Sequence, residues 1–179
     1  MANVFISSDW HLHHFNLLNF KRVDGTPVRS FSCVEEMDEY IIDRHNAVVK
    51  PSDHYYNLGD VVMDRKYLNL VSRFNGHKRL VRGNHDIFRT KFYMEYFDEI
   101  YGSRVLDNII FTHIPIHPNN MGRFKGNCHG HIHQNPSYPG KYINVSVEAL
   151  DDYTPISLED LKLKFEKIQD LDSELCTSI

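Results

Sequence analysis

One stretch, residues 79–86, reads Arg79-Leu80-Val81-Arg82-Gly83-Asn84-His85-Asp86. Its first half is a short β-rich run, and its second half is a glycine turn that carries three polar side chains. The same order, a strand-like run followed by polar residues, occurs at 4–11, 55–60 and 109–113. These runs end in Ser8-Asp9-Trp10-His11, Gly59-Asp60 and His113. Because the carboxyl ends of strands meet at the ligand crevice of an open α/β sheet, we expect these side chains to converge.

Helical patterns separate these strands. Apolar residues at spacings of three and four predict helices over about 34–49 and 67–74, the second ending at Gly76. A further strand is expected at 142–147, followed by a helix from 158 onward with Ser157 as its N-cap. The alternation of strands and helices predicts one α/β domain over residues 1–179, without a repeat or a linker.

The composition is that of an ordinary folded protein. The chain has 179 residues, 41% of them hydrophobic and 25% charged, which is enough for one domain with its own core. It has no apolar run long enough to cross a membrane and no secretion signal at its start. Three cysteines, Cys33, Cys128 and Cys176, lie far apart and predict no disulfide framework. A cytoplasmic location is therefore expected.

Charge is distributed unevenly along the chain. Residues 151–179 hold eight acidic and three basic residues, whereas residues 1–150 hold 16 acidic and 17 basic residues. A broad nucleic-acid surface would need a clearly basic domain, so this near-neutral body favours a small anionic substrate instead. The unusual count is the 12 histidines, because histidine is both the commonest metal ligand and a general acid–base.

Five segments bring metal-ligand side chains to the expected crevice, the fifth being Cys128-His129-Gly130-His131-Ile132-His133. Mixed oxygen and imidazole ligands suit Mn, Fe, Zn or Ni, and seven ligands are too many for one tetrahedral ion. Two ions that share a bridging carboxylate fit better. Glycines 59, 83 and 130 directly precede candidate ligands, where a close backbone approach excludes a Cβ atom. The candidate ligands are Asp9, His11, Asp60, Asn84, His113, His131 and His133.

In one-letter form these motifs are D-x-H, G-D, G-N-H-D, a strand-end histidine and G-H-x-H, in that order. This order resembles the calcineurin-like metallophosphoesterase superfamily. The small, uncapped bacterial and phage members are the most similar, also in Asp9-x-His11-x-x-His14-x-Asn16 and in the ending from Asn144 to Ser157. The resemblance implies a four-layer αββα sandwich, in which helices flank two mixed β-sheets.

The resemblance also implies roles for the motif residues. One divalent metal ion would be held by Asp9, His11 and His133, and a second by Asn84, His113 and His131, with Asp60 bridging the two. The ions would be Mn, Fe, Ni or Zn, with Mg as a further possibility. A water molecule between the metals would attack phosphorus. His85 would protonate the leaving oxygen or stabilise the transition state, and Asp86 would orient a metal ligand or His85.

Four residues are candidates for contacts with the substrate: Arg123, His14, Asn16 and His117. Arg123 lies in the loop before G-H-x-H, and arginine binds phosphate with two parallel hydrogen bonds. Arg29, Arg82 and Lys125 are further candidates for phosphate contact. His129 alternates with His131 along the chain, so it is expected to face the opposite side and to be structural.

The expected activity is metal-dependent hydrolysis of a small phosphate ester, either a nucleotide-type phosphodiester or a monoester. A nuclease is the first alternative, and a non-catalytic binding module on the same fold is the second. The resemblance does not extend to the Ser/Thr protein phosphatases, because here the Asp64-Arg65 pair is displaced by one residue and Asp86 stands in place of their glutamate. No membrane partner is expected, and the oligomeric state is left open.

Overall fold

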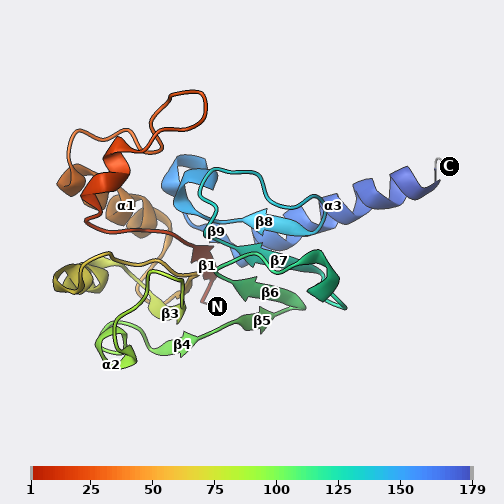
Figure 1. Ribbon diagram of the computed structural model, residues 1–179. Helices are drawn as coiled ribbons and strands as arrows, with labels where there is room; N and C mark the ends of the chain where they lie inside the picture. Colours follow the sequence, from red (N-terminus) through yellow and green to blue (C-terminus); the bar gives the residue numbers. More distant parts are fainter. Residues whose placement is uncertain (1, 178–179) are drawn as a thin grey trace.

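Two mixed β-sheets form the centre of the computed structural model, which describes residues 2–177 and their side chains as far as residue 170 (Figure 1). The first sheet has the strand order β4-β3-β2-β1-β9, and the second has the order β5-β6-β7-β8. The first sheet comprises β1 (Val4–Ser7), β2 (His54–Asn57), β3 (His77–Val81), β4 (Glu99–Tyr101) and β9 (Ile156–Ser157). The second comprises β5 (Arg104–Leu106), β6 (Ile109–Thr112), β7 (Gly126–His129) and β8 (Tyr142–Asn144).

Strand directions bring the carboxyl ends of both sheets to one edge. Strands β1 to β4 run parallel, and only β9 is antiparallel to its neighbour in this sheet. Strands β6, β7 and β8 are likewise parallel, with β5 antiparallel at the edge. Ser8, just after β1, pairs with Ser146, just after β8, so the ends of the two sheets lie together. The expected two-sheet α/β fold is confirmed.

The first hydrophobic core lies between the first sheet and the helices on its outer face. These helices are α1 (Val34–Val48), the 3-10 helix η2 (Arg65–Arg73) and the short α2 (Thr90–Tyr93). The ring of Trp10 is fully buried here and stacks against Phe74 at 3.8 Å and against Tyr55 at 5.4 Å between ring centroids. Because Trp10 stands between Asp9 and His11, this core anchors the loop that carries the first motif.

The second core lies between the two sheets. Ile6 and Tyr56 from the first sheet pack here with Phe111 from the second. Helix α3 (Leu158–Thr177) contributes Phe165 to this core and then extends away from the body on the side opposite α1 (Figure 1). Loops lie over the outer face of the second sheet. The Tyr142 hydroxyl of β8 donates to the Ile116 carbonyl in one loop, and His129 of β7 shares a hydrogen bond with Ser137 in another.

The remaining segments are short. They are η1 (Phe15–Asn19), η3 (Pro118–Asn120), η4 (Val147–Ala149) and η5 (Asp151–Tyr153), all of them 3-10 helices. Cys33 and Cys128 are unpaired, and the side chain of Cys176 lies outside the described residues. No described helix combines the length and the apolar character that crossing a bilayer requires.

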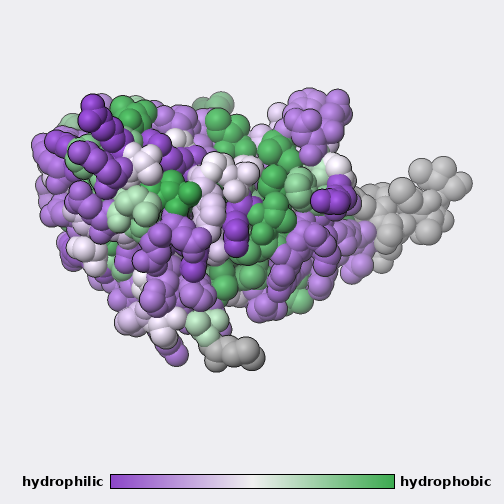
Figure 2. Space-filling view, turned by 90° about the horizontal axis from the view of Figure 1, so that it is seen from below, coloured by the Kyte–Doolittle hydropathy of each residue, from purple (hydrophilic) through white to green (hydrophobic). Residues whose placement is uncertain are grey.

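The lower face of the molecule, as oriented in Figure 1, has the surface of an ordinary folded domain. Seen from below, hydrophilic residues cover most of it, and hydrophobic residues form a band between them (Figure 2). Most large apolar side chains lie instead in the two cores, which therefore hold the loops of the site in place.

Candidate metal centre

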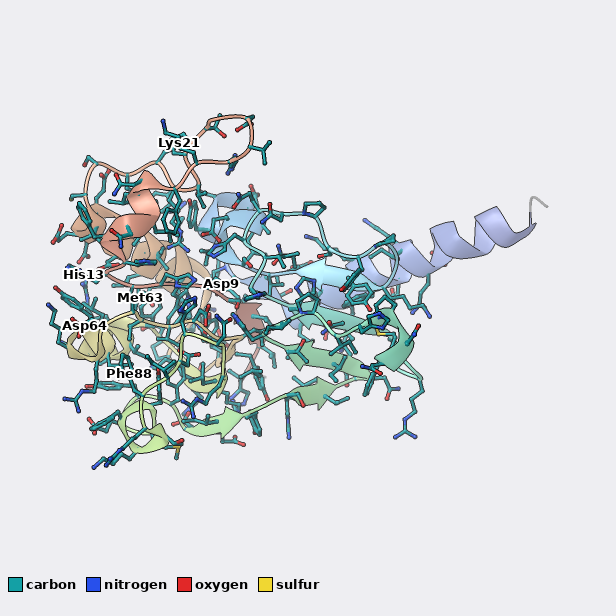
Figure 3. All side chains as sticks on the ribbon, in the orientation of Figure 1. Asp9, His13, Lys21, Met63, Asp64 and Phe88 are labelled. Atoms are coloured by element: carbon teal, nitrogen blue, oxygen red, sulfur yellow. The ribbon has the colours of Figure 1, made fainter. Side chains whose placement is uncertain are left out.

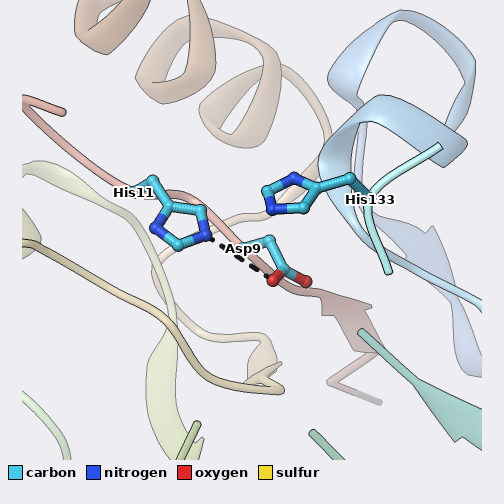
Figure 4. Close-up of side chains that lie close together, drawn as sticks. All are labelled: Asp9, His11 and His133. Atoms are coloured by element: carbon cyan, nitrogen blue, oxygen red, sulfur yellow. Dashed lines mark ion pairs between the residues drawn. The ribbon is translucent and has the colours of Figure 1, made fainter. Parts of the chain in front are cut away.

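Two groups of three side chains at the carboxyl edge of the sheets could each hold a metal ion. The first is Asp9, His11 and His133, and the second is Asp60, His113 and His131. Within each group the potential ligand atoms all lie within 4.8 Å of one another. Figure 4 shows the first group, with the rings of His11 and His133 on either side of the Asp9 carboxylate. These rings stack with a centroid distance of 5.2 Å.

Asp60 lies between the two groups. Its Oδ2 atom is 3.6 Å from Nε2 of His11, in the first group, and 3.3 Å from Nε2 of His113, in its own group. Asn84 joins the second group, because its Oδ1 atom is 2.9 Å from Nε2 of His113. The structure therefore brings all seven candidate ligands together, with one carboxylate oxygen located where a bridging ligand is needed.

Several candidate ligands are held by one atom and present another to the centre. Oδ2 of Asp9 accepts hydrogen bonds from the Ser146 hydroxyl and from the His131 amide, both at 2.9 Å, which leaves Oδ1 free. Oδ1 of Asp60 accepts from the His85 amide, which leaves Oδ2 free. Nδ1 of His113 donates to the Leu58 carbonyl at 2.8 Å, so a neutral ring presents a lone pair on Nε2.

The unpartnered atoms test whether metal ions fit this site. Oδ1 of Asp9 and both ring nitrogens of His11 are buried, and none has a hydrogen-bond partner among the described residues. Burying such groups without a partner is unfavourable by about 1–3 kcal/mol each. A divalent cation would satisfy a carboxylate oxygen and an imidazole nitrogen at once, and both are ordinary transition-metal ligands. The residues present therefore fit two divalent ions.

Backbone strain is concentrated at the same residues. Five candidate ligands have left-handed backbone conformations that residues other than glycine seldom adopt. Such conformations persist only where the surrounding structure imposes them, and they cluster at functional sites. The five residues and their φ angles are Asp9 (60°), His11 (46°), Asp60 (58°), His131 (72°) and His133 (50°).

The glycines before the candidate ligands are required by close contacts. A Cβ atom on Gly83 would lie 2.7 Å from the Asp60 amide nitrogen and closer still to the Asp60 carboxylate. A Cβ atom on Gly130 would collide with the side chains of Ser8 and Asp9. Gly59 has a φ of +105°, and its Cβ would meet the Gly83 backbone at 2.5 Å. The Gly59 and Gly83 turns therefore pack against each other, and the Gly130 turn packs against the loop after β1, so each close approach excludes a Cβ atom, as the sequence predicts.

The carboxylates and imidazoles of the centre shift one another's pKa values. Burial raises the pKa of Asp9 and Asp60, but the neighbouring histidines outweigh it, and the pKa of each carboxyl is lower than usual. Burial lowers the pKa of His113, whereas the neighbouring carboxylates of Asp60 and Asp9 raise it, and the net shift is upward. For His131, burial and the neighbouring His113 lower the pKa. Ionised carboxylates beside imidazoles are the forms that bind metal.

A buried ion pair supports the first group, and sequence reasoning missed it. Oε1 of Glu148 accepts from Nδ1 of His133 at 2.9 Å and from Nε of Arg29 at 2.7 Å. The Arg29 guanidinium also donates to the backbone carbonyls of Asp9 and Trp10. Arg29 was a candidate for phosphate contact, but it is only 1% exposed. It positions the loop that carries Asp9 and His11 instead. The sequence position of Ser146 and Glu148 could have indicated that they lie near the site, because both follow the end of a strand, as the candidate ligands do.

The two residues predicted to be catalytic differ in their environment. His85 is exposed beside the centre, and its ring lies 5.6 Å from the ring of His11. Asp86 is buried, and its carboxylate accepts hydrogen bonds from the amides of Asp60, Val61 and Gly83. Burial and the charge of Asp60 raise the pKa of Asp86, although these amides lower it. Asp86 thus positions the Asp60 turn, and no described hydrogen bond joins its side chain to His85.

The four predicted substrate contacts are dispersed. The half-buried ring of His14 lies 5.6 Å from the His11 ring, at the edge of the centre, and burial lowers its pKa to about 4. Asn16 is exposed on η1, with no hydrogen bond to the centre among the described residues. His117 is exposed, and its Nδ1 atom caps η3 by accepting from the Asn119 amide.

Arg123 is not brought to the centre. It is exposed in the loop that returns the chain to the start of β7, whereas His129 and His131 are at the other end of that strand. The neighbouring Lys125 donates its amide to the carbonyl of Asn108, just before β6 begins, which fixes the loop at that distant end. Arg82 is also occupied, since its guanidinium donates to the carbonyls of Asp86 and Phe88.

Comparisons with known proteins agree with this geometry. Residues 2–171 match the family model of the calcineurin-like phosphoesterases, so fold and site define a metallophosphoesterase. The chain belongs to the calcineurin-like phosphoesterase family. It is 33% identical to the uncharacterized protein MJ1445 of Methanocaldococcus jannaschii over 182 aligned positions, which cover 93% of each chain.

A solved structure is similar as well. The crystal structure of AQ665, a protein of unknown function from Aquifex aeolicus, superposes with a TM-score of 0.70 at 28% sequence identity. The alignment covers 90% of this chain and 98% of that one. The fold is therefore shared over nearly the whole length of both proteins.

Proposed function

We propose that this protein is a dinuclear metal-dependent phosphoesterase that hydrolyses a small, nucleotide-type phosphodiester or monoester. One observation carries the proposal: a carboxylate oxygen of Asp60 lies between two groups of ligands, and the exposed His85 stands beside them. When bound, two divalent ions supply the charge that neutralises a phosphoryl group and activates a water molecule.

The side chains divide the remaining tasks. Asp9, His11 and His133 would hold one ion, and Asn84, His113 and His131 would hold the other, with Asp60 shared. His85 donates a proton to the leaving oxygen, a role that suits its exposure and its place next to Asp60. Asp86 fixes the Asp60 and Gly83 turns, and His14 lines the edge where the substrate enters.

The ligand set supports Mn, Fe, Ni or Zn, with Mg as a further candidate, because it combines imidazoles with carboxylate and amide oxygens. The unpaired Cys33 and Cys128 suit the cytoplasmic location that we propose. The near-neutral body and the dispersed arginines favour a small ester over a long nucleic acid.

A panel of nucleotide monoesters and diesters, assayed with Mn, Ni, Mg and Zn, tests the activity. We expect hydrolysis of at least one ester with one of these metals and its loss on chelation. Rapid cleavage of single-stranded DNA alone would identify a nuclease. Metal binding without hydrolysis of any ester would identify a binding module.

Two variants test the assignment of roles. His85→Ala should keep both metals but lose about 10²–10⁴-fold in rate on an alkyl ester, and lose least on a nitrophenyl ester, whose leaving group needs no proton. His113→Ala should lose metal affinity and rate on every ester. If His85→Ala loses metal in the same way as His113→Ala, then His85 is a ligand. If it retains full rate on alkyl esters, it is not the general acid.

A further inference from the structure

A hairpin over residues 20–28 projects beside the metal centre. The Val28 amide donates to the Phe20 carbonyl at 2.9 Å, and the Arg22 amide donates to the Thr26 carbonyl at 2.7 Å. The hairpin is the red-orange loop at the top of Figure 1, and Figure 3 labels Lys21 on it, above Asp9. The proposed mechanism makes no use of this hairpin.

A cavity of about 630 Å³ separates the hairpin from the segment that follows β7. Leu17, Phe20 and Val28 form its apolar wall, and His133, Gln134 and Asn135 line the opposite side. Because His133 is also a candidate ligand of the first group, the cavity adjoins the metal centre on that side. Its size is within the usual range of small-molecule sites, about 300–1,000 Å³.

Contacts between neighbouring aromatic rings also join the cavity to the centre. The ring of His11 lies 5.6 Å from that of His14, and the ring of His14 lies 6.0 Å from that of Phe20 in an edge-to-face arrangement. A phosphate held by the metals would therefore have an aromatic ring within reach of its alcohol part. Phe20 is 49% exposed, so one face of its ring is open to a ligand.

The polar groups of the cavity suit the edge of a nucleobase. Gln134 and Asn135 each offer an amide donor and an amide acceptor, the groups that read the hydrogen-bonding edge of a base. Oε1 of Gln134 is buried and has no hydrogen-bond partner among the described residues. Lys21, Arg22 and Asp24 also line the cavity, so the hairpin side carries charges of both signs with one positive charge in excess.

We propose that this cavity is the base-binding subsite of a nucleotide ester, in which Phe20 stacks on the base and Gln134 hydrogen-bonds to its edge. This inference rests on the phosphoesterase activity proposed above and specifies its substrate class. The metal centre holds the phosphoryl group, and the nucleoside occupies the space between the hairpin and residues 133–135.

Two diesters with the same leaving group test the subsite: thymidine p-nitrophenyl phosphate and methyl p-nitrophenyl phosphate. Phe20→Ala should lower kcat/KM for the thymidine ester roughly 5- to 150-fold, the range expected for loss of one base–aromatic stack, and leave the methyl ester unchanged. Phe20→Tyr should restore most of the loss. Calorimetric titration with thymidine monophosphate should show the same weakening of Kd without turnover.

Phe15→Ala is the matched control, because Phe15 is 64% exposed on η1 and does not line the cavity. It should leave both esters unaffected. If neither diester is hydrolysed with any metal and thymidine monophosphate is also left intact, the proposed function fails. If both are hydrolysed and Phe20→Ala affects them equally, the subsite is wrong while the function stands. If a phenyl diester depends on Phe20 as strongly as the thymidine ester, the cavity is a general apolar site and the nucleotide assignment is overturned.

Discussion

Replacing Glu148 by alanine should destabilise the metal-free protein strongly. The side chains of Glu148 and Arg29 are both 0% exposed and form an ion pair of 2.7 Å. Removing one partner of such a pair leaves the other charge buried and uncompensated, which typically lowers the free energy of unfolding by about 3–5 kcal/mol. His133 would also lose the group that orients its ring, so metal affinity should fall roughly 10- to 100-fold.

Urea denaturation of the chelated wild type and variant measures the first effect, and titration of the refolded proteins with Mn measures the second. Glu39→Ala is the matched control, since Glu39 pairs with Arg73 on the surface, where both side chains are about half exposed. That loss should be under about 1 kcal/mol. If Glu148→Ala is no more destabilising than Glu39→Ala, then the buried ion pair does not form in solution and our account of this site is wrong.

Three further predictions concern the same fold. Gly83→Ala should lower the affinity for both metals and destabilise the protein by about 1–3 kcal/mol, because the added Cβ would displace the Asp60 carboxylate. Metal titration and urea denaturation measure the two effects, and an unchanged metal affinity would contradict the prediction. Purified protein should bind about two transition-metal equivalents by elemental analysis, and Asp60→Asn should reduce both. Burial lowers the pKa of His45 in the folded protein to about 4, whereas in the unfolded chain it is about 6.5. As the pH falls below about 6.5, His45 is protonated in the unfolded chain before it is protonated in the folded one, so the free energy of unfolding should drop by about 3 kcal/mol by pH 4. Urea denaturation of chelated protein across this range should show a smaller drop for His45→Gln; equal drops would exclude His45 as the cause.

Elements with a clear apolar pattern could be predicted from the sequence, whereas strands β4, β5, β7 and β9 could not. The helix expected at 34–49 forms as α1 over Val34–Val48, and Ser157 caps α3 by accepting from the Asp160 amide. The helix expected at 67–74 forms as the 3-10 helix η2, since apolar spacing of three suits either geometry. Strands β4, β5 and β9 have only two or three residues, which is too short for an alternating pattern to show. The strand expected at 142–147 forms only over Tyr142–Asn144, as β8, and Val147 begins η4.

The candidate ligands could be predicted because each follows a strand and a turn, features that are local in sequence. Their supports could not, because Glu148 and Arg29 are 119 residues apart and pair only through the fold. Arg123 was expected at the site for its chemistry, but the direction of β7 puts its loop at the other end. Strand direction, and not residue type, separates the loops that reach the metals from those that do not.

Hydrogen bonds from the scaffold orient three of the candidate ligands. Leu58 fixes His113 through a backbone carbonyl, the His85 amide fixes Asp60, and Glu148 fixes His133, so these hydrogen bonds direct a donor atom of each residue toward the centre. Metal binding then requires little rearrangement, because the strained loops and the two cores have already positioned the ligands. The hairpin over residues 20–28 adds a cavity beside this centre, and in our proposal that cavity selects the nucleoside part of the substrate.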